Sequence, residues 1–314
     1  MNSTSKPNVL LIGAGAVGSY FAGRCAAAGQ IQLTAVFRHD TEVVRRDGIR
    51  AESIAGDFTV HPRIVAAASE CGEAPDWIIL ATKVLPEIDP VALLGEALGP
   101  QTGILLIQNG LGIEEPLAQA FPGHPLLSAV AYIGVSRTET PGLIRHIGGG
   151  TLKLGDYPAG SAPEALKQWT KVFTAAGVPV TPQEDIVRAR WFKLLWNIPY
   201  NGLSVVGGKI GTRRMADDPE LAELAERLMK EIQAIAASDG RILTDQDIQD
   251  NIDYTRNFPD YKTSMLLDFE ARRPLECRAI VGNALAAARR NGVPAPTLQA
   301  LFALLVSCDR ENRA

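Results

Sequence analysis

A glycine-rich run near the N-terminus has the residue types and spacing that bind a phosphate group. Gly13-Ala14-Gly15-Ala16-Val17-Gly18 has the pattern G-x-G-x-x-G, directly after the apolar run Asn8–Ile12 and at the start of the helix-like segment Val17–Ala28. In this order the first glycine permits a tight turn and the second lets the backbone approach a pyrophosphate, while the third lets the helix pack on the strand. The helix N-terminus adds free N–H groups and positive dipole charge. A plain tight turn is the alternative, but the place of the run between strand and helix favours a dinucleotide site.

The residue after the second predicted strand discriminates between NAD and NADP. An NAD site usually places Asp or Glu there, about 20 residues after the loop, to bind the ribose hydroxyls. Here Leu33–Phe37 is followed by Arg38, whose guanidinium can hold the 2′-phosphate of NADP through charge-assisted hydrogen bonds. We therefore expect NADPH as the cofactor. We interpret Asp40, with Thr41, as the cap of a helix over Glu42–Asp47. The alternative for Arg38 is a solvated surface charge.

A lysine and two asparagines are spaced for proton transfer. Lys193, Asn197 and Asn201 are four residues apart, so they share one stripe of a predicted helix, and the aromatic and aliphatic residues around them indicate burial. Burial lowers the pKa of a lysine, and such a group can protonate a carbonyl oxygen as hydride reaches its carbon. Pro199 removes a backbone hydrogen bond and predicts a bend near Leu195. The alternative is an amphipathic helix whose polar edge meets water.

Polar residues also stand where two predicted strands end. Lys83 follows Trp77–Ala81, and Asn109-Gly110 follows Ile104–Ile107. Ligands of parallel sheets bind at the carboxyl ends of the strands, so both residues should face the cofactor. An Asn-Gly pair alone would indicate only a turn.

A serine and a glutamate further along the chain complete the set of candidate residues. Ser264 and Asp268 are four residues apart on a predicted helix, and Glu276 follows. Ser264 could donate a hydrogen bond to a substrate carboxylate, and Glu276 could orient or balance the charge of Lys193. Without their context these three residues would be unremarkable.

Strands and helices alternate in the first half of the chain and predict an α/β fold. Strands separated by helical segments indicate a doubly wound, Rossmann-type parallel sheet with helices on its faces. The segments Ile49–Ile54 and Phe58–Ile64 predict an inserted hairpin, and Ser128–Val135 with Leu143–Leu154 predict antiparallel strands that finish the sheet.

After Val180 the pattern becomes almost wholly helical, which predicts a second, all-helical domain. Asp218-Pro219 is a favoured helix start, and Gly240 supplies the stop. We therefore expect an NADP-binding Rossmann-like domain over residues 1–181 and a helical substrate and catalytic domain over 182–314. Such an arrangement predicts a cleft between the two.

Composition excludes several other classes of protein. The 314 residues are 46% hydrophobic and 21% charged with a net charge of −4, so we expect neither nucleic acid nor a membrane as partner. The four cysteines and four histidines show no metal-ligand spacing and no disulfide framework. With no signal peptide and no membrane-length apolar run in the sequence, we expect a cytoplasmic protein with a small-molecule substrate. The sequence does not decide between a monomer and a homodimer.

Taken in order, these motifs resemble the ketopantoate reductase family over essentially the whole chain. The match consists of G-x-G-x-x-G, Arg38, Lys83, Asn109-Gly110, K-x-x-x-N-x-x-x-N, S-M-L-x-D and a glutamate eight residues later. The resemblance implies a Rossmann domain joined to a helical domain, reducing a small 2-oxo acid such as 2-dehydropantoate with NADPH, in pantothenate synthesis.

By position, the resemblance also implies a role for each candidate residue. Lys193 would be the general acid and Glu276 its supporting carboxylate. Asn109 would lie by the nicotinamide and the substrate, and Lys83 by the adenosine or phosphates of the cofactor. Three further residues would bind the polar groups and the carboxylate of the substrate: Asn197, Asn201 and Ser264.

The sequence departs from the family pattern in its substrate half. Tyr261 stands where asparagine is usual, Cys277-Arg278 replaces a branched aliphatic residue and Asp, and Trp196 and Pro199 replace smaller residues. Two alternatives therefore stay open. One is a related dehydrogenase of the same plan that acts on an imino acid, an opine or a larger hydroxy acid. The other is a protein that senses NADPH without turnover, although such a sensor needs no proton donor.

Overall fold

The computed structural model describes residues 6–257 and 260–313, which form two compact units. Unit 1 comprises the chain up to Lys83, then Ile88–Gln108 and Glu114–Ile186. Unit 2 comprises Val84–Glu87, Asn109–Ile113 and the chain from Val187 onward. Two short segments that follow strands of unit 1 thus belong to the helical unit 2.

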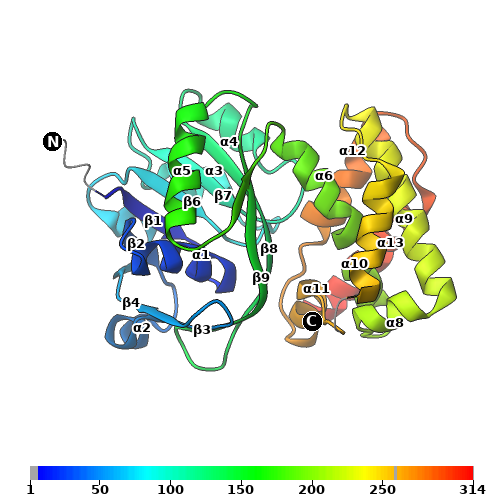
Figure 1. Ribbon diagram of the computed structural model, residues 1–314, viewed down its shortest axis with the longest axis horizontal. Coiled ribbons are helices and arrows are strands. Elements are labelled where there is room, and N and C mark those ends of the chain that lie inside the picture. Colours follow the sequence, from blue (N-terminus) through cyan, green and yellow to red (C-terminus); the bar gives the residue numbers. More distant parts are fainter. Residues whose placement is uncertain (1–5, 258–259, 314) are drawn as a thin grey trace. The chain divides into compact units, whose positions relative to one another are not determined.

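The described part of unit 1 is built on a ten-stranded sheet with the order β4-β3-β9-β8-β7-β6-β1-β2-β5, and with β10 beside β9 (Figure 1). Its strands are β1 (Asn8–Ile12), β2 (Gln32–Val36), β3 (Ile49–Ser53), β4 (Phe58–Val60), β5 (Arg63–Val65), β6 (Trp77–Leu80), β7 (Gly103–Ile107), β8 (Leu126–Arg137), β9 (Leu143–Asp156) and β10 (Val180–Pro182). The middle strands are continuous apolar runs because helices cover both faces of a parallel sheet.

The strand pairing confirms the predicted fold class and corrects one detail. The strands from β8 through β7, β6, β1 and β2 to β5 are parallel, whereas β8–β9 and β3–β4 are antiparallel as expected. The hairpin strand expected over Phe58–Ile64 is wrong in extent. It breaks before Arg63, and β5 pairs with β2 instead. Pro62, which cannot donate to a sheet ladder, lies at the break.

The helices of unit 1 cover the sheet. They are α1 (Ala16–Ala27), α2 (Thr41–Asp47), the 3₁₀ turn η1 (Ala68–Cys71), α3 (Pro90–Gly95), α4 (Glu115–Ala120) and α5 (Pro163–Ala175). Helices α1 and α5 lie on the same face of the sheet (Figure 1). There Phe21 meets Phe173 edge-on, and Trp169 meets Trp77 of β6. The predicted cap of α2 is wrong in one respect. Asp40 is the N-cap residue, but its backbone is left-handed (φ 60°) and its side chain makes no cap bond.

Unit 2 is helical, as predicted. Its elements are α6 (Ile186–Trp196), the π-turn η2 (Asn197–Asn201), α7 (Gly202–Val206), α8 (Thr212–Asp217), α9 (Pro219–Ser238), α10 (Asp245–Asn257), α11 (Ser264–Glu270), the π-turn η3 (Arg278–Gly282), α12 (Asn283–Arg290) and α13 (Pro296–Arg313). Asp218 caps α9 as expected, because its carboxylate accepts the N–H of Leu221 at 3.2 Å.

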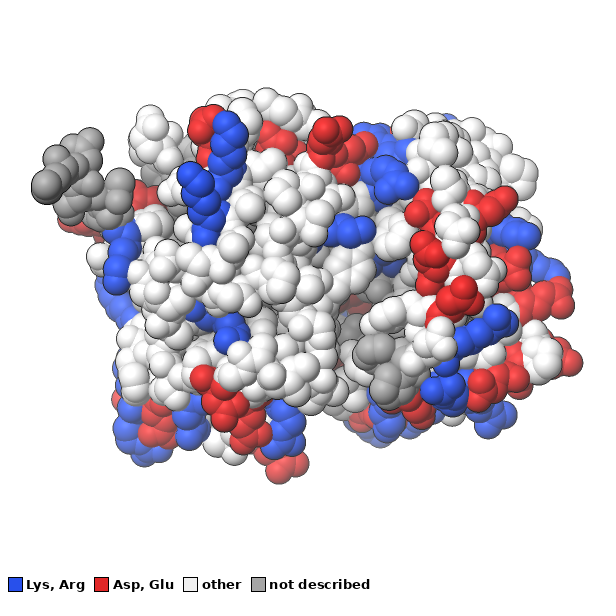
Figure 2. All heavy atoms as spheres, viewed as in Figure 1, with Lys and Arg blue, Asp and Glu red and all other residues white. Residues whose placement is uncertain are grey.

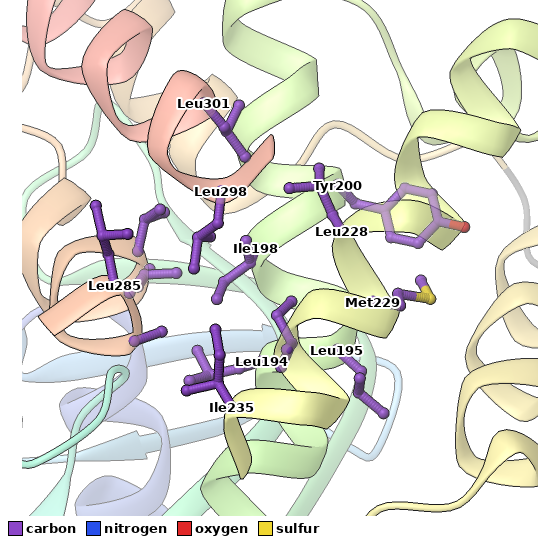
Figure 3. Close-up of a cluster of buried hydrophobic side chains, with 14 of the residues drawn as sticks. Leu194, Leu195, Ile198, Tyr200, Leu228, Met229, Ile235, Leu285, Leu298 and Leu301 are labelled. Carbon is purple, nitrogen blue, oxygen red and sulfur yellow. The ribbon is translucent and has the colours of Figure 1, made fainter. Parts of the chain in front are cut away.

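The core of unit 2 fixes the helix that carries Lys193. Figure 3 shows Leu194 and Ile198 among side chains of α9, α12 and α13, including Ile235, Leu285 and Leu298. All five are at most 3% exposed. The apolar side of α6 is therefore anchored, which leaves its polar stripe in a defined position.

Pro199 changes the helix differently from the predicted bend near Leu195. The α-helix gives way after Trp196 to one π-turn, and α-helix resumes at Gly202. A π-turn bonds each residue to one five positions away, and this wider ring accommodates a residue that lacks an N–H. Asn197 and Asn201 both lie in that turn.

Charges on unit 2 are mixed in sign. Figure 2 shows basic and acidic side chains interspersed over its helices on the face in view. On α9 they pair one turn apart, as in Arg227–Glu223 and Lys230–Glu226. Within residues 6–257 and 260–313, no helix is long and apolar enough to cross a membrane. The same residues contain no cluster of His, Cys, Asp or Glu suited to a metal ion.

Candidate active site

The glycine-rich loop joins β1 to α1, and its three glycines have three different environments. Gly13 has φ 97°, and an added Cβ would lie 2.4 Å from the backbone nitrogen of Thr82. At Gly18 an added Cβ would lie 2.4 Å from the carbonyl oxygen of Gly13 and 2.9 Å from the Cβ of Ala81. At Gly15, by contrast, it would meet nothing within 4 Å. The loop is thus packed against the end of β6 on one side and open at its middle glycine.

Among the described residues, the open side of the loop leads into backbone N–H groups that have no intrahelical partner. The N–H of Gly15 donates to the carbonyl of Gly13 at 2.7 Å, and Ser19 donates to Gly15 at 2.9 Å. Between them, Ala16, Val17 and Gly18 form the first turn of α1, where backbone N–H groups have no partner four residues earlier. Free N–H groups together with the helix dipole favour an anion at this place. Ala14 is the residue of the loop between Gly13 and Gly15.

Arg38 follows β2 and is exposed. Within the described chain, its guanidinium has no hydrogen bond or ion pair. The nearby carboxylate of Asp40 lies 3.8 Å from the guanidinium of Arg137. Arg38 therefore keeps its donors available for an anion.

Hydrogen bonds tie the ends of β6 and β7 together beside the loop. The Nε2 of Gln108 donates to the carbonyl oxygen of Thr82 at 2.8 Å and contacts its Oγ1 at 3.0 Å. Lys83 is the next residue after Thr82, and Thr82 is also the neighbour of Gly13. The structure therefore brings the Lys83 segment and the phosphate loop together within unit 1.

Lys193 is joined to Asn109, although the two residues are distant in sequence. Its Nζ donates to the Oδ1 of Asn109 at 2.9 Å. Burial lowers the pKa of Lys193 to about 8, the positive charge of Arg190 lowers it as well, and the negative charge of Glu276 acts in the opposite direction. The structure thus collects Lys193, Asn109 and Glu276 at one place in unit 2, with a lysine acidic enough to release its proton near neutral pH.

The carboxylate of Glu276 is held by the backbone. Its Oε1 accepts the N–H of Val84 at 2.9 Å. Val84 follows Lys83 in the chain and belongs to unit 2. Both segments that unit 2 takes from the strand ends, Val84–Glu87 and Asn109–Ile113, therefore contact residues of the lysine cluster.

The other predicted substrate residues lie on two neighbouring elements. Asn197 and Asn201 are buried in η2, and the Oδ1 of Asn201 has no hydrogen-bond partner within the described residues. The hydroxyl of Ser204 bonds to the carbonyl of Asn201 at 2.8 Å and to the Oγ1 of Thr263 at 2.8 Å. Thr263 caps α11, of which Ser264 is the first residue. A buried polar chain thus connects η2 with the start of α11.

Ser264 is exposed, and its Oγ makes no hydrogen bond with another described residue. The structure does not join it to Lys193 directly. Asp268, on the same helix, bonds to the guanidinium of Arg273 at 2.9 Å.

One residue of the cluster was not identified from the sequence. Arg190 is 3% exposed, and its Nη1 donates to the carbonyl oxygen of Gly110 at 3.1 Å. The available signal was its position three residues before Lys193, which places both on one helix face. In the sequence alone the residue resembles any arginine of an amphipathic helix.

The residues that depart from the family pattern have their own contacts. The Nε1 of Trp196 donates to the Oγ1 of Thr255 at 3.0 Å, and its ring packs on that of Tyr200. Two hydrogen bonds join Tyr261 and Thr212. The N–H of Thr212 donates to the carbonyl oxygen of Tyr261, and the N–H of Tyr261 donates to the Oγ1 of Thr212. Both aromatic residues are thus integrated into the helical framework of unit 2.

Comparison with known proteins identifies the family. The protein-family model "Ketopantoate reductase PanE/ApbA" matches residues 9–159, and the family model for its C-terminal domain matches residues 185–307. A 2-dehydropantoate 2-reductase of Nostoc sp. is 35% identical, over 96% of this chain and 95% of that protein. The crystal structure of 2-dehydropantoate 2-reductase from Methylococcus capsulatus has a TM-score of 0.90 and 40% identity, with 98% of each chain covered.

A more distant structure shares the fold alone. D-mandelate dehydrogenase, solved with NADH and anilino(oxo)acetate, has a TM-score of 0.87 at 19% identity and covers 98% of this chain and 99% of its own. The family models and the relatives of 35% and 40% identity cover both units, so they bear on the whole chain. The protein is an oxidoreductase that belongs to the ketopantoate reductase family.

Proposed function

We propose that this protein reduces 2-dehydropantoate, or a closely related small 2-oxo acid, to the 2-hydroxy acid with NADPH, in the synthesis of pantothenate. The observation that carries the proposal is the hydrogen bond from Lys193 to Asn109, with the pKa of Lys193 lowered to about 8. A lysine in that state can protonate an oxygen at neutral pH. We further propose that residues 1–181 bind the cofactor, that residues 182–314 carry the chemistry and that the two meet at a cleft, with a homodimer as the assembly.

The residues of unit 1 fit a dinucleotide phosphate. The open space at Gly15 and the free N–H groups of Ala16–Gly18 suit a pyrophosphate, because a side chain at Gly15 would fill that space. Arg38 would hold the 2′-phosphate, and Lys83 would lie by the phosphates or the adenosine. Bound NADPH would supply the hydride for the carbonyl carbon of the substrate.

Lys193 would act as the general acid. As the carbonyl carbon accepts hydride, negative charge develops on its oxygen, and an alkoxide is far more basic than a lysine of pKa about 8. The proton on Nζ therefore moves to that oxygen, which becomes the hydroxyl of the product. Asn109 and Glu276 keep the ammonium charged and oriented, and solvent returns the proton afterwards.

The amides would bind the substrate. The Oδ1 of Asn109 is used by Lys193, so its Nδ2 remains as a donor for a carbonyl or carboxamide oxygen. The unpartnered Oδ1 of Asn201 suits a hydroxyl donor, since a buried acceptor without a partner is costly. Asn197 and Ser264 would bind the remaining polar groups and the carboxylate.

The test is NADPH oxidation with 2-dehydropantoate and a panel of other 2-oxo and imino acids, with NADH as the control cofactor. We expect turnover with 2-dehydropantoate or a compound that differs only in its side chain. Turnover of imino acids or opines alone would replace the substrate assignment with that of a related dehydrogenase. Tight NADPH binding without oxidation across the panel would instead favour a sensor and reject the enzyme.

A further inference from the structure

One turn of α6 binds two consecutive residues of the segment after β7. Lys193 binds the side chain of Asn109, and Arg190, three residues earlier on the same helix face, binds the backbone carbonyl of Gly110. The two hydrogen bonds measure 2.9 Å and 3.1 Å. The orientation of the Asn109 carboxamide therefore depends on a backbone that Arg190 holds.

The same segment is fixed from its other side by η3 and by the first residue of α12. Gly110 has φ 106°, and an added Cβ would lie 2.8 Å from both the Cβ and the carbonyl oxygen of Ala279. The N–H of Leu111 donates to that carbonyl at 3.0 Å, and the Nδ2 of Asn283 donates to the carbonyl of Leu111 at 2.7 Å. With these contacts in place, the carbonyl of Gly110 remains for α6, and Arg190 takes it.

Arg190 places a positive charge in a buried position beside a second cation. Its side chain is 3% exposed and lies near a second cation, Lys193, on the same face. Burial of a charge and like charges one turn apart both oppose folding. Residues that break local rules of stability are concentrated at functional sites.

We propose that Arg190 is a positioning residue for the reduction: by holding the carbonyl of Gly110 it presents the carboxamide of Asn109 to the Lys193 ammonium and to the reacting carbonyl group. The inference rests on the proposed function, because it assigns Arg190 to the site where Lys193 gives up its proton. Arg190 itself does not touch the reacting atoms.

The position of Arg190 also has an electrostatic consequence. Two charged side chains act on Lys193 from different elements, Arg190 on α6 and Glu276 just before η3, and they act in opposite directions. Arg190 favours release of the proton from Lys193, and Glu276 favours its retention. Removal of the Arg190 charge should therefore raise the pKa of Lys193 and leave a weaker acid.

The test compares Arg190→Met, which removes charge and donor, with Arg190→Gln, which keeps a donor, and Arg190→Lys, which keeps the charge. The matched control is Arg188→Met, because Arg188 is an exposed arginine of the same helix that pairs with Asp247. We expect Arg190→Met to lower kcat by about 10- to 100-fold, as displaced reacting groups do. KM for the 2-oxo acid should change much less. Arg190→Lys should recover part of kcat, and the control should keep it.

A second measurement does not depend on activity. In protein labelled with ¹³C at the lysine side chains, the Cε signal of Lys193, assigned by its loss in Lys193→Met, reports its titration. Arg190→Gln and Arg190→Met should shift that titration to higher pH, whereas Arg190→Lys and Arg188→Met should leave it near the wild type. If Arg190→Met unfolds, Arg190→Gln and Arg190→Lys still decide the question.

The outcomes separate the two proposals. A wild type that turns over no 2-oxo acid overturns the proposed function, whatever the variants do. An active wild type whose Arg190→Gln and Arg190→Met variants keep kcat and the Lys193 titration, and lose only thermal stability, overturns the positioning role. A loss of kcat together with a raised titration, partly restored by Arg190→Lys, supports it.

Discussion

The Nζ of Lys193 and the Oδ1 of Asn109 are 2.9 Å apart, although 84 residues separate them in the chain. Asn109 comes two residues after β7, at a strand end of unit 1, yet it belongs to the helical unit 2. The contact therefore ties the segment after a Rossmann strand to the helix that carries the acid. Because the Oδ1 of Asn109 accepts the hydrogen bond of the ammonium, its Nδ2 is the amide atom that remains to bind a ligand.

Replacement of Lys193 should remove the proton donor and leave the fold intact. We expect Lys193→Met to lower kcat about 10²- to 10⁴-fold, which is the usual contribution of a general acid. The control is Lys230→Met, because Lys230 is an exposed lysine of α9 paired with Glu226. Steady-state kinetics of both variants would check this. A Lys193→Met enzyme with the kcat of the wild type would exclude Lys193 as the acid.

The rate of reduction should fall at high pH, because Lys193 must be protonated to act as the acid. Its pKa is lowered to about 8, so the ammonium form required for reduction predominates below that pH. We expect kcat for reduction to be level below about pH 8 and to fall about tenfold per pH unit above it. Oxidation of the 2-hydroxy acid needs the neutral amine, so its rate should rise over the same range. A reduction rate that rose between pH 8 and pH 10 would contradict the assignment.

The same pKa predicts a dependence of stability on pH. The pKa of Lys193 is about 8 in the folded protein and 10.5 for the free side chain, so the unfolded state binds more protons between these values. The charged Lys193 therefore lowers the unfolding free energy of the wild type below pH 8, and this destabilisation disappears as the pH rises toward 10.5. Relative to Lys193→Met, it should gain about 2 kcal/mol of unfolding free energy between pH 7 and pH 10. Urea unfolding at both values would check this, and a difference that did not change with pH would contradict it.

Local sequence patterns predicted the elements of this fold where a single rule decides them. The run Gly13–Gly18 leads from β1 into the first turn of α1 as expected, and Asp218 caps α9. Both depend on short-range geometry, since each involves residues within one turn or one loop. The antiparallel pairing of β8 with β9 also followed from two strands around one turn.

The predictions that were wrong or missing concern features that depend on contacts between distant parts of the chain. The strand expected over Phe58–Ile64 is split at Pro62. Its second part, β5, pairs with β2, which is distant in sequence. Pro199 is accommodated in a π-turn and not in a simple bend, because the core on both sides holds the flanking helices in place. Arg190 was missed because its partner, the carbonyl of Gly110, is 80 residues away. No local pattern contains such a contact.

The loop glycines offer a matched pair of substitutions. Gly15→Ala should leave the stability unchanged but weaken NADPH binding, because its methyl group enters the open space where phosphates would lie. Gly13→Ala should instead lower the unfolding free energy by 1 kcal/mol or more, because φ is 97° and the new Cβ would collide with the backbone of Thr82. Thermal unfolding and cofactor titration of both variants would check this. Unchanged NADPH affinity in a folded Gly15→Ala protein would place the phosphates elsewhere.

Arg38 should determine the preference between the two nicotinamide cofactors. Its exposed guanidinium has no ion pair within the described residues, and a 2′-phosphate would give it one. We expect Arg38→Gln to raise KM for NADPH on the order of 10-fold or more, as the loss of a charge-assisted hydrogen bond of about 1.5–3 kcal/mol implies, with KM for NADH little changed. Arg46→Gln is the control, because Arg46 is exposed in the same unit and pairs with Asp47. Equal losses with both cofactors would show that Arg38 contributes to the fold of the site and not to recognition of the phosphate, and the preference for NADPH would then need another residue.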